Sequence, residues 1–376
     1  MKKIFILFSF ISIFSFVQNI SAESMYSPTW GFFIDLPEGY ELVEGDGKDR
    51  FSFAGPEKLK FDIIVYSRYN TLLDMLEDIN RRLSNQGDVD LFDYNGKQAA
   101  IMKLNFGNND GWGFAVELDN TTGKQPPMLI ALAYGPADKT DFELFHISAL
   151  DSISPTTAER YYPGPLLEYG FPRGAPVNSA LVNGMNVMFY ENDAEASQVL
   201  IEREFSILQS YMNSPLLREA TARYYRFIYR DSYDRVKNAV DAIAQSFGGR
   251  PNLNDTEKRE FAQKILSFVQ SFEYERDLSG SDFLNLINAV TEGRGDCDNR
   301  AMLFAIILAN TNIRSAMMLS HHYSHAMALA DIKGSGARFE SDGIQWLVAE
   351  TTALIDIGLI AQDVSNPQHW FAIMLE

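Results

Sequence analysis

The stretch Gly293-Arg294-Gly295-Asp296-Cys297-Asp298-Asn299-Arg300 decides the predicted fold of the C-terminal half of this chain. It holds the only cysteine among 376 residues. The two glycines allow a tight turn, and residues 301–310 are mostly good helix formers. Asp296 stands at the position of a helix N-cap, so we expect Cys297 in the first turn of a buried helix.

A cysteine at this place has two interpretations. A lone cysteine is most often a small, inert, buried residue. At a helix start, however, free backbone N–H groups and the helix dipole favour the thiolate, which is the nucleophilic form. The second interpretation predicts that the pKa of Cys297 lies below that of a free thiol.

Two segments downstream favour the second interpretation. Residues 324–330 (SHAMALA) place His325 at the head of a predicted strand, and a second predicted strand, beginning at Trp346, ends at Glu350. Cysteine, histidine and acid in this order suit a thiolate–imidazole–carboxylate set if both strands pack on the helix. Four other residues are alternatives, two for the base and two for the acid: His321, His322, Asp331 and Asp342.

The segments GDCDNR, SHAMA and AETT, with Phe-Val-Gln at 268–270 upstream, resemble the core of the transglutaminase-like superfamily. The resemblance covers about residues 255–360 and implies a papain-like α+β core. It also implies that Cys297 is the nucleophile, His325 its base and Glu350 the residue that orients the imidazole. Most members carry Asp at the third position, and Glu350 resembles a bacterial branch that has Glu-Thr-Thr there.

Gln270 is the candidate oxyanion donor, because a side-chain amide beside the cysteine could stabilise negative charge on a substrate oxygen. In the resembling family, a Gln or Trp upstream of the cysteine often has this role. A surface glutamine fits the pattern equally well. Asp296 and Asp298 are interpreted as cap and local structure, and Arg300 is expected to pair with one of them or with Glu292.

A metal site is an alternative use of these side chains, because His321 and His322 lie close to His325 in the sequence and Cys297 could be a fourth ligand. Zinc sites use compact ligand spacings. Residues i and i+4 of a strand stand about 13 Å apart, too far for one ion. We therefore expect neither a metal nor another cofactor.

Residues 1–22 are predicted to be a signal peptide, with Lys2 and Lys3 before a short apolar run and Ala22 at a plausible cleavage site. An uncleaved anchor is the alternative. No cysteine lies near the cut, so a lipidated N-terminus is not expected. The mature protein is expected to be periplasmic or secreted, without an integral membrane span.

The charge of the chain limits its partners. Removal of the leader changes the formal net charge from −18 to −20, because two lysines are lost. Such an acidic protein is poorly suited to nucleic acid or anionic lipid. With one cysteine, an internal disulfide is excluded. A protein, peptide or cell-wall peptide is the expected partner, as substrate; the oligomeric state is left open.

Residues 26–154 are predicted to form an accessory domain, an antiparallel α/β sandwich. Alternating or β-rich runs indicate strands at 60–67, 98–106, 112–118 and 128–134, and helical spacing indicates helices at 71–83 and 141–153. This order weakly resembles the small sandwich of the photosystem PsbP type. No catalytic residues are recognised in this part.

Residues 155–189 are predicted to be a linker or irregular segment, because residues 155–180 are rich in Pro, Gly and Tyr. One or two strands, joined at Asn183-Gly184, are expected within residues 177–190. Residues 190–376 are predicted to form the transglutaminase-like domain with a helical lobe. One helix of this lobe, from Pro215 to Phe247, alternates arginines with tyrosines. The arginines could bind phosphate or carboxylate groups, but we expect them to pair with Glu202, Glu204, Asp231 and Asp234.

The sequence therefore predicts an exported cysteine-dependent acyl-transfer enzyme of the α+β class. Hydrolysis of a peptide or amide bond is favoured over protein cross-linking. The alternative from another class is a non-catalytic envelope binding or assembly protein that retains the fold.

Overall fold

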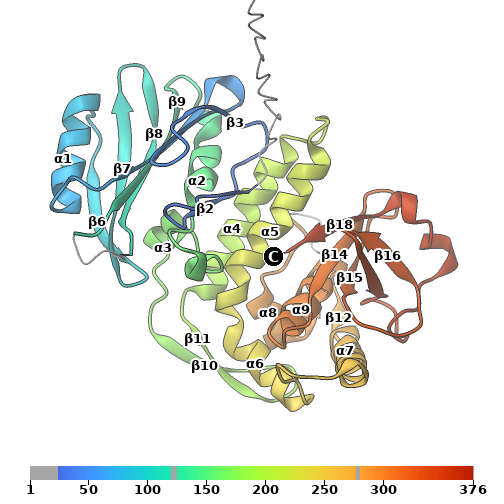
Figure 1. The fold of residues 1–376 in the computed structure, drawn as a ribbon. Coiled ribbons are helices and arrows are strands. Elements are labelled where there is room, and N and C mark those ends of the chain that lie inside the picture. The colour runs from blue at the N-terminus through green and yellow to red at the C-terminus, as the bar shows by residue number, and fades with distance from the viewer. Residues whose placement is uncertain (1–23, 120–124, 277–279, 376) are drawn as a thin grey trace, which may run out of the picture.

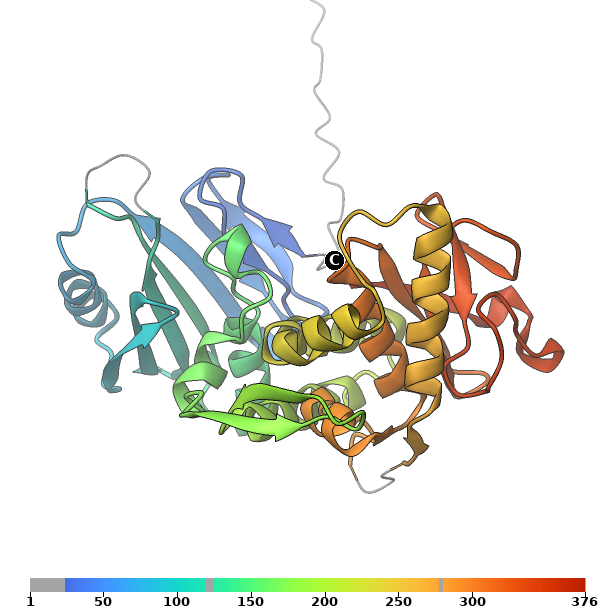
Figure 2. The same cartoon turned by 90° about the horizontal axis from the view of Figure 1, so that it is seen from below.

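The computed structural model describes residues 24–119, 125–276 and 280–375 and shows a mixed α and β protein. Two antiparallel sheets lie at opposite ends of the molecule, with most of the helices between them (Figure 1, Figure 2). The predicted α+β class is confirmed.

The first sheet is antiparallel throughout, with the strand order β3-β4-β5-β9-β8-β7-β6. Its strands are β3 (Glu41–Gly45), β4 (Arg50–Ala54), β5 (Lys60–Tyr66), β6 (Val89–Tyr94), β7 (Lys97–Phe106), β8 (Asn109–Glu117) and β9 (Met128–Pro136). A short separate pair, β1 (Met25–Tyr26) and β2 (Phe33–Ile34), precedes them.

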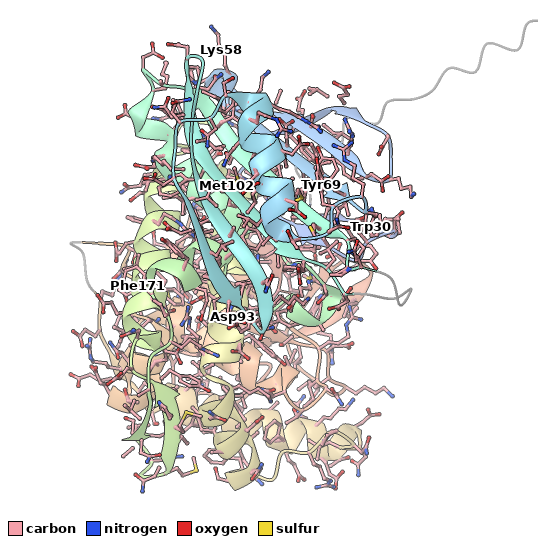
Figure 3. All side chains as sticks on the ribbon, turned by 90° about the vertical axis from the view of Figure 1, so that its left-hand side faces the viewer. Trp30, Lys58, Tyr69, Asp93, Met102 and Phe171 are labelled. Atoms are coloured by element: carbon pink, nitrogen blue, oxygen red, sulfur yellow. The ribbon has the colours of Figure 1, made fainter. Side chains whose placement is uncertain are left out.

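Side-chain alternation gives this sheet two apolar faces. On β7, Ala100 and Met102 pack in one cluster with α1 (Leu72–Leu83), while Ala99 and Ile101 belong to another that includes residues of α2 (Glu143–Asp151). Figure 3 shows α1 lying across the sheet, with Met102 beside it. The two helices thus cover opposite faces.

The strongly patterned elements of this part are confirmed within a few residues. They are the predicted helices at 71–83 and 141–153 and the predicted strands at 60–67, 98–106, 112–118 and 128–134. The sequence did not predict β3, β4 and β6. β3 and β6 lie at the two sheet edges, and β3 is exposed along its whole length, so neither has the apolar alternation that marks a half-buried strand.

The middle of the chain begins with α3 (Pro165–Gly170) and a hairpin of β10 (Pro176–Ala180) and β11 (Asn186–Tyr190). Gly184 at the turn has φ +82°, a conformation that favours glycine. The strands expected within residues 177–190 and their junction at Asn183-Gly184 are confirmed, so the segment predicted to be a linker contains a hairpin and the short helix α3. The predicted domain boundaries stay predictions.

The helical part consists of α4 (Asp193–Gln209), α5 (Leu217–Arg235), α6 (Lys237–Ser246) and α7 (Asp255–Gln270). The prediction of one helix from Pro215 to Phe247 is wrong. The helix begins at Leu217, and Val236, with ψ near 3°, separates α5 from α6. The predicted start of α7 is confirmed, since Asn254 and Glu257 form a capping box.

The second sheet is antiparallel with the strand order β16-β17-β15-β14-β18. Its strands are β14 (Ser315–Ser320), β15 (His325–Ala330), β16 (Arg338–Ser341), β17 (Ile344–Ala349) and β18 (Phe371–Met374). Before them come the short parallel pair β12 (Glu273–Tyr274) and β13 (Arg294–Gly295), with α8 (Leu286–Glu292) between.

The helix α9 (Cys297–Ala309) lies between this sheet and the helices. It packs on β14 and β15 and against α6 and α7 (Figure 1). All of residues 299–308 are buried, which explains why the helix is apolar on all sides rather than on one stripe.

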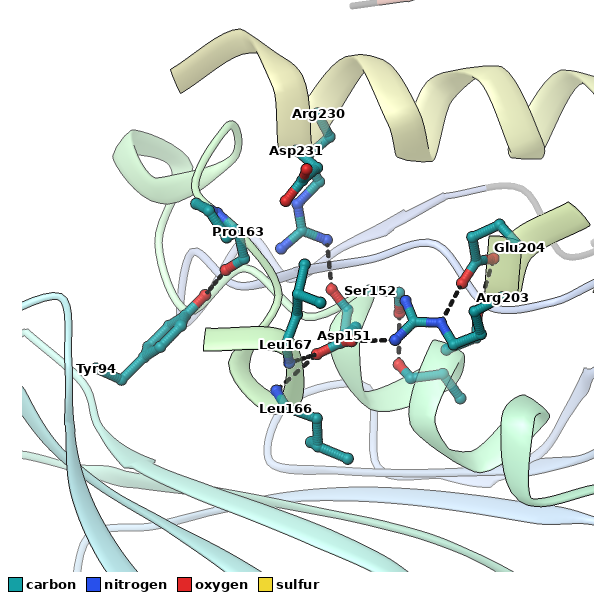
Figure 4. A network of polar contacts seen from close by, with 12 residues as sticks. Tyr94, Asp151, Ser152, Pro163, Leu166, Leu167, Arg203, Glu204, Arg230 and Asp231 are labelled. Atoms are coloured by element: carbon teal, nitrogen blue, oxygen red, sulfur yellow. Dashed lines mark hydrogen bonds and ion pairs between the residues drawn. The ribbon is translucent and has the colours of Figure 1, made fainter. Parts of the chain in front are cut away.

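Buried ion pairs connect the first sheet to the helices (Figure 4). At the end of α2, Asp151 accepts hydrogen bonds from the backbone of Leu166 and Leu167 and pairs with Arg203 of α4 at 2.5 Å. Arg223 of α5 pairs with Glu204 of α4 at 2.8 Å. The expected pairing of the arginines of α5 with carboxylates is thus confirmed for two of them, Arg223 with Glu204 and Arg235 with Asp231.

None of the helices in the described residues is long and apolar enough to cross a membrane. The predicted signal peptide, residues 1–22, lies outside the described residues.

Substitution of Asp151 tests the importance of the buried network. Asp151→Ala leaves Arg203 with one carboxylate partner, Glu204, and removes the acceptor for two backbone N–H groups. We expect the free energy of unfolding, measured by urea denaturation, to fall by about 3–5 kcal/mol. The control is Asp241→Ala, which breaks the exposed pair of Lys237 and Asp241. This variant should change the free energy of unfolding far less. Equal losses for the two variants would contradict a structural role of the network.

Candidate active site

The site is built around the N-terminus of α9. The side chain of Asp296 accepts a hydrogen bond from the backbone N–H of Asn299 at 3.0 Å, and the Asn299 side chain accepts one from the backbone of Asp296 at 3.2 Å. Asn299 also donates to the carbonyl of Leu284. This reciprocal capping starts the helix at Cys297, as the sequence predicts.

The sulfur of Cys297 is nearly enclosed, since the residue is 7% exposed. Its thiol donates to Oδ1 of Asp298 at 3.4 Å. The backbone N–H of Ala326, the residue after His325, acts to lower the pKa of this thiol. The other oxygen of Asp298 accepts a short hydrogen bond, 2.5 Å, from the hydroxyl of Tyr225 on α5.

The charges near the sulfur oppose formation of a thiolate. Burial raises the pKa of the Cys297 thiol far above its usual range, and the carboxylates of Asp298 and Asp296 raise it further. Burial and Asp298 also raise the pKa of Asp296 to about 8. The sequence-based prediction of a lowered thiol pKa is therefore wrong for this arrangement. A helix dipole contributes about 0.3–1 kcal/mol at an exposed site, less than the desolvation of a buried charge.

His325 and Glu350 are brought together by strand pairing. His325 begins β15, and Glu350 directly follows β17, which pairs with β15 in antiparallel register. Nε2 of His325 lies 2.9 Å from Oε2 of Glu350. A carboxylate only accepts, so Nε2 carries the hydrogen, and in the neutral imidazole Nδ1 is the free acceptor.

Glu350 is itself held in place. Its second oxygen accepts hydrogen bonds from the backbone N–H and the hydroxyl of Thr352, at 2.8 and 2.7 Å. Burial acts to raise the pKa of Glu350, but the hydrogen bond and charge of His325, together with Thr352, lower it overall. The carboxyl group is therefore ionised at neutral pH, as an orienting partner for an imidazole requires.

The structure places Cys297, His325 and Glu350 in one region of the fold. The helix α9, which begins at Cys297, packs on β15, which begins at His325. The ring of Trp370 packs edge-on against the imidazole at 6.0 Å. The catalytic roles of the three residues stay predictions.

The proposed oxyanion role of Gln270 does not fit its contacts. Its side-chain nitrogen donates to the carbonyl oxygens of Glu350 at 2.8 Å and Ile355 at 3.0 Å. Both amide hydrogens are thereby engaged, which leaves no donor for a substrate oxygen. Gln270 instead fixes the chain that carries Glu350.

The predicted ion pair of Arg300 is also wrong. This buried guanidinium donates to the carbonyl oxygens of Gly295, Phe272 and Thr351, so it connects the cysteine loop to the segment after Glu350. It also lies over the ring of Tyr274 at 5.3 Å.

The other histidines near the site are exposed or half-buried and stack on aromatic rings. His321 stacks on Phe371, and His322 on His369, with ring centroids 5.4 and 4.1 Å apart. Within the described part of the chain, one set of three metal-ligating groups lies within 4.8 Å, and it contains Asp296, Cys297 and Asp298 but no histidine. The structure thus does not gather the histidines with the cysteine as a metal site needs.

Sequence reasoning missed the part played by Tyr225 and Asp298. Asp298 was interpreted as local structure, yet it is the acceptor of the thiol hydrogen. Tyr225 is 73 residues away in the sequence, and one tyrosine in a helix with several others carries no signal of this contact. Only tertiary packing of α5 beside α9 reveals it.

Comparison with known proteins gives little support for a family. The sequence matches no family profile and no curated protein. Among solved structures, it is similar to cyanobacterial PsbP (CyanoP) from Synechocystis sp. PCC 6803, with TM-score 0.27 and 16% identity over 37% of this chain and 94% of that one.

Two further solved structures, from Cytophaga hutchinsonii and Bacteroides thetaiotaomicron, are similar at TM-score 0.24 and 12% identity. The first, described as a candidate cysteine protease, matches over 89% of this chain and 78% of its own length. The second matches over 59% and 80%. TM-scores this low carry no argument about function.

The acidic surroundings of the thiol lead to a test. Asp298→Asn removes a negative charge but keeps an acceptor for Tyr225, so the thiol pKa should fall and more thiolate should be present at each pH. We expect alkylation of Cys297 by iodoacetamide, followed from pH 6 to 10, to accelerate at a given pH. In the unsubstituted protein it should be slow near pH 6.

Asp331→Asn is the control, because Asp331 is exposed at the end of β15. Its alkylation profile should match that of the unsubstituted protein. If that protein had a midpoint below the free-thiol value of about 8.5, the electrostatic description of the site would be contradicted.

Proposed function

We propose that this protein is a cysteine-dependent acyl-transfer enzyme that hydrolyses peptide or amide bonds, with Cys297, His325 and Glu350 as its catalytic set. The observation that carries the proposal is the 2.9 Å contact between His325 and Glu350, at the start of the strand β15 that packs on α9, the helix that begins at Cys297. The sequence resemblance to the transglutaminase-like superfamily supports the same assignment.

In the proposed reaction, Nδ1 of His325 accepts the thiol proton as the sulfur attacks the carbonyl carbon of the substrate. The C–N bond then breaks, and the imidazolium returns the proton to the leaving amine. Water, deprotonated by the same imidazole, attacks the thioester and releases the acid and the thiol. Glu350 stabilises the imidazolium during both steps.

A different oxyanion donor is needed because Gln270 is occupied. The backbone N–H of Cys297 is the first of α9 and has no acceptor within the helix. We propose it as one donor to the developing oxyanion, where the helix dipole adds to the stabilisation.

The raised pKa of the thiol is compatible with this chemistry. A thiol that is neutral at rest can lose its proton to the imidazole as the substrate binds, so a preformed ion pair is not required. The substrate is a protein, peptide or cell-wall peptide, met outside the cytoplasm if the predicted leader is cleaved. A protein cross-linking enzyme would use the same thioester with an amine in place of water.

A non-catalytic binding or assembly protein is the second candidate. It is favoured by one observation, the enclosed thiol that donates its hydrogen to Asp298 rather than to a base. This candidate predicts a fold that survives substitution of Cys297 with no loss of function.

Hydrolysis of p-nitrophenyl acetate distinguishes the candidates without knowledge of the natural substrate. The protein should release nitrophenol with a burst equal to the amount of active thiol, and Cys297→Ala should abolish the burst. His325→Ala should slow it by about 10²–10⁴-fold, since it removes the general base. Glu350→Gln should slow it less but clearly.

Two matched controls belong to this assay. His369→Ala removes a nearby histidine, and Glu340→Gln neutralises an exposed glutamate on β16; both should behave as the unsubstituted protein. If the protein does not cleave the ester, or if Cys297→Ala and His325→Ala cleave it at the unsubstituted rate, the non-catalytic binding protein becomes the better assignment.

A further inference from the structure

A second site lies away from Cys297, in a cavity of about 560 Å³ where α5 meets the C-terminal strand β18. Figure 1 shows these two elements side by side near the centre of the molecule. Phe33 of β2 and Arg160 complete the wall. The volume is in the range of small-molecule sites, roughly 300–1,000 Å³.

Arg230 of α5 lines this cavity and carries a buried charge without a carboxylate partner. It is 8% exposed and donates to the backbone carbonyls of Asp151 at 2.9 Å and Ile153 at 2.7 Å (Figure 4). Among the described residues it makes no ion pair, and its Nε–H has no acceptor. Burial of a cation without an anionic partner costs free energy, and a bound anion would offset that cost.

The carboxylates near Arg230 form ion pairs with other arginines. The pairs are Asp151 with Arg203, Asp231 with Arg235, and Asp35 with Arg226. Among the described residues none of these acids is within ion-pair distance of Arg230, although Oδ2 of Asp231 also has no hydrogen-bond partner there.

Arg160 adds a second guanidinium to the cavity. It lies over the ring of Phe33 at 4.9 Å, and within the described residues no carboxylate is in ion-pair distance of it. A guanidinium that stacks on an aromatic ring can still donate hydrogen bonds from its N–H groups to a planar acceptor such as a carboxylate.

The remaining lining limits the class of ligand. Asp35, Glu38 and Glu219 also line the cavity, so a doubly charged phosphate would meet repulsion. Burial raises the pKa of Glu38 to about 7, so this group is partly neutral near pH 7 and can donate a hydrogen bond. Phe33, Phe227, Ile373 and Leu375 offer apolar surface beside the arginines.

We propose that this cavity binds the carboxylate of a small organic acid with an apolar side chain. The guanidinium groups of Arg160 and Arg230 take the carboxylate, and the aromatic and aliphatic walls take the side chain. The site is independent of the chemistry at Cys297. It shares α5 with it, since Tyr225, next to Arg226, reaches Asp298.

Binding of N-acetyl-leucine, measured by isothermal titration calorimetry, tests this assignment. We expect saturable binding to the unsubstituted protein and to Cys297→Ala alike, and none of N-acetyl-leucinamide, which lacks the carboxylate. Arg160→Gln should weaken binding about tenfold or more, since a charged hydrogen bond is lost. Among the described residues the Arg160 side chain has no hydrogen-bond or ion-pair partner, so this variant should keep its stability.

Arg218→Gln is the matched control, because Arg218 is exposed on the same helix and does not line the cavity. It should bind N-acetyl-leucine within twofold of the unsubstituted protein. Equal binding of the amide, tighter binding of inorganic phosphate, equal weakening by the two arginine variants, or no binding at millimolar concentration would each overturn the proposal.

Discussion

The enclosure of α9 is the constraint on which the rest of the C-terminal half depends. A helix that is apolar on every side must be covered by the second sheet on one side and by helices on the other. Its N-terminus is then a place where polar groups can gather, because four backbone N–H groups there need partners. The side chain of Asp296 accepts a hydrogen bond from one of these N–H groups, that of Asn299, and Cys297 is therefore the first helical residue. The strands that cover α9 bring His325 and Glu350 to the same end.

Two opposing influences meet at the sulfur. Burial, Asp296 and Asp298 hold the proton on the thiol, whereas the Ala326 N–H favours negative charge there. Burial has the largest effect on the thiol pKa in the unliganded protein, and the two carboxylates add to it. In the proposed enzyme, the balance changes when a substrate carbonyl replaces the contact with Asp298 and the proton passes to His325. Tyr225 then keeps Asp298 in position and ties the site to α5, the helix that also carries the arginine-lined cavity.

Local patterns in the sequence predicted much of the fold. The cap at Asp296, the helix from Cys297 to Ala309 and the positions of His325 and Glu350 at strand ends all follow from residue type and spacing. The exceptions have physical causes. Val236 interrupts a helix without a proline or glycine, and the edge strand β3 lacks an apolar face. Gln270 and Arg300 find backbone carbonyls, and no single sequence reveals which carbonyls will lie nearby. The thiol pKa depends on total burial, which a helix start alone does not determine.

The most direct test of the catalytic assignment is to map the residue that reacts with an electrophilic peptide probe, such as a peptide vinyl sulfone, by mass spectrometry after digestion. If Cys297 and His325 act together, the native protein should carry the probe on Cys297, and His325→Ala should lose most of the labelling under the same conditions while an unchanged circular dichroism spectrum shows that the fold is kept. Labelling of Cys297 that is absent in the native protein, or equally fast without His325, would contradict a catalytic thiol–imidazole pair.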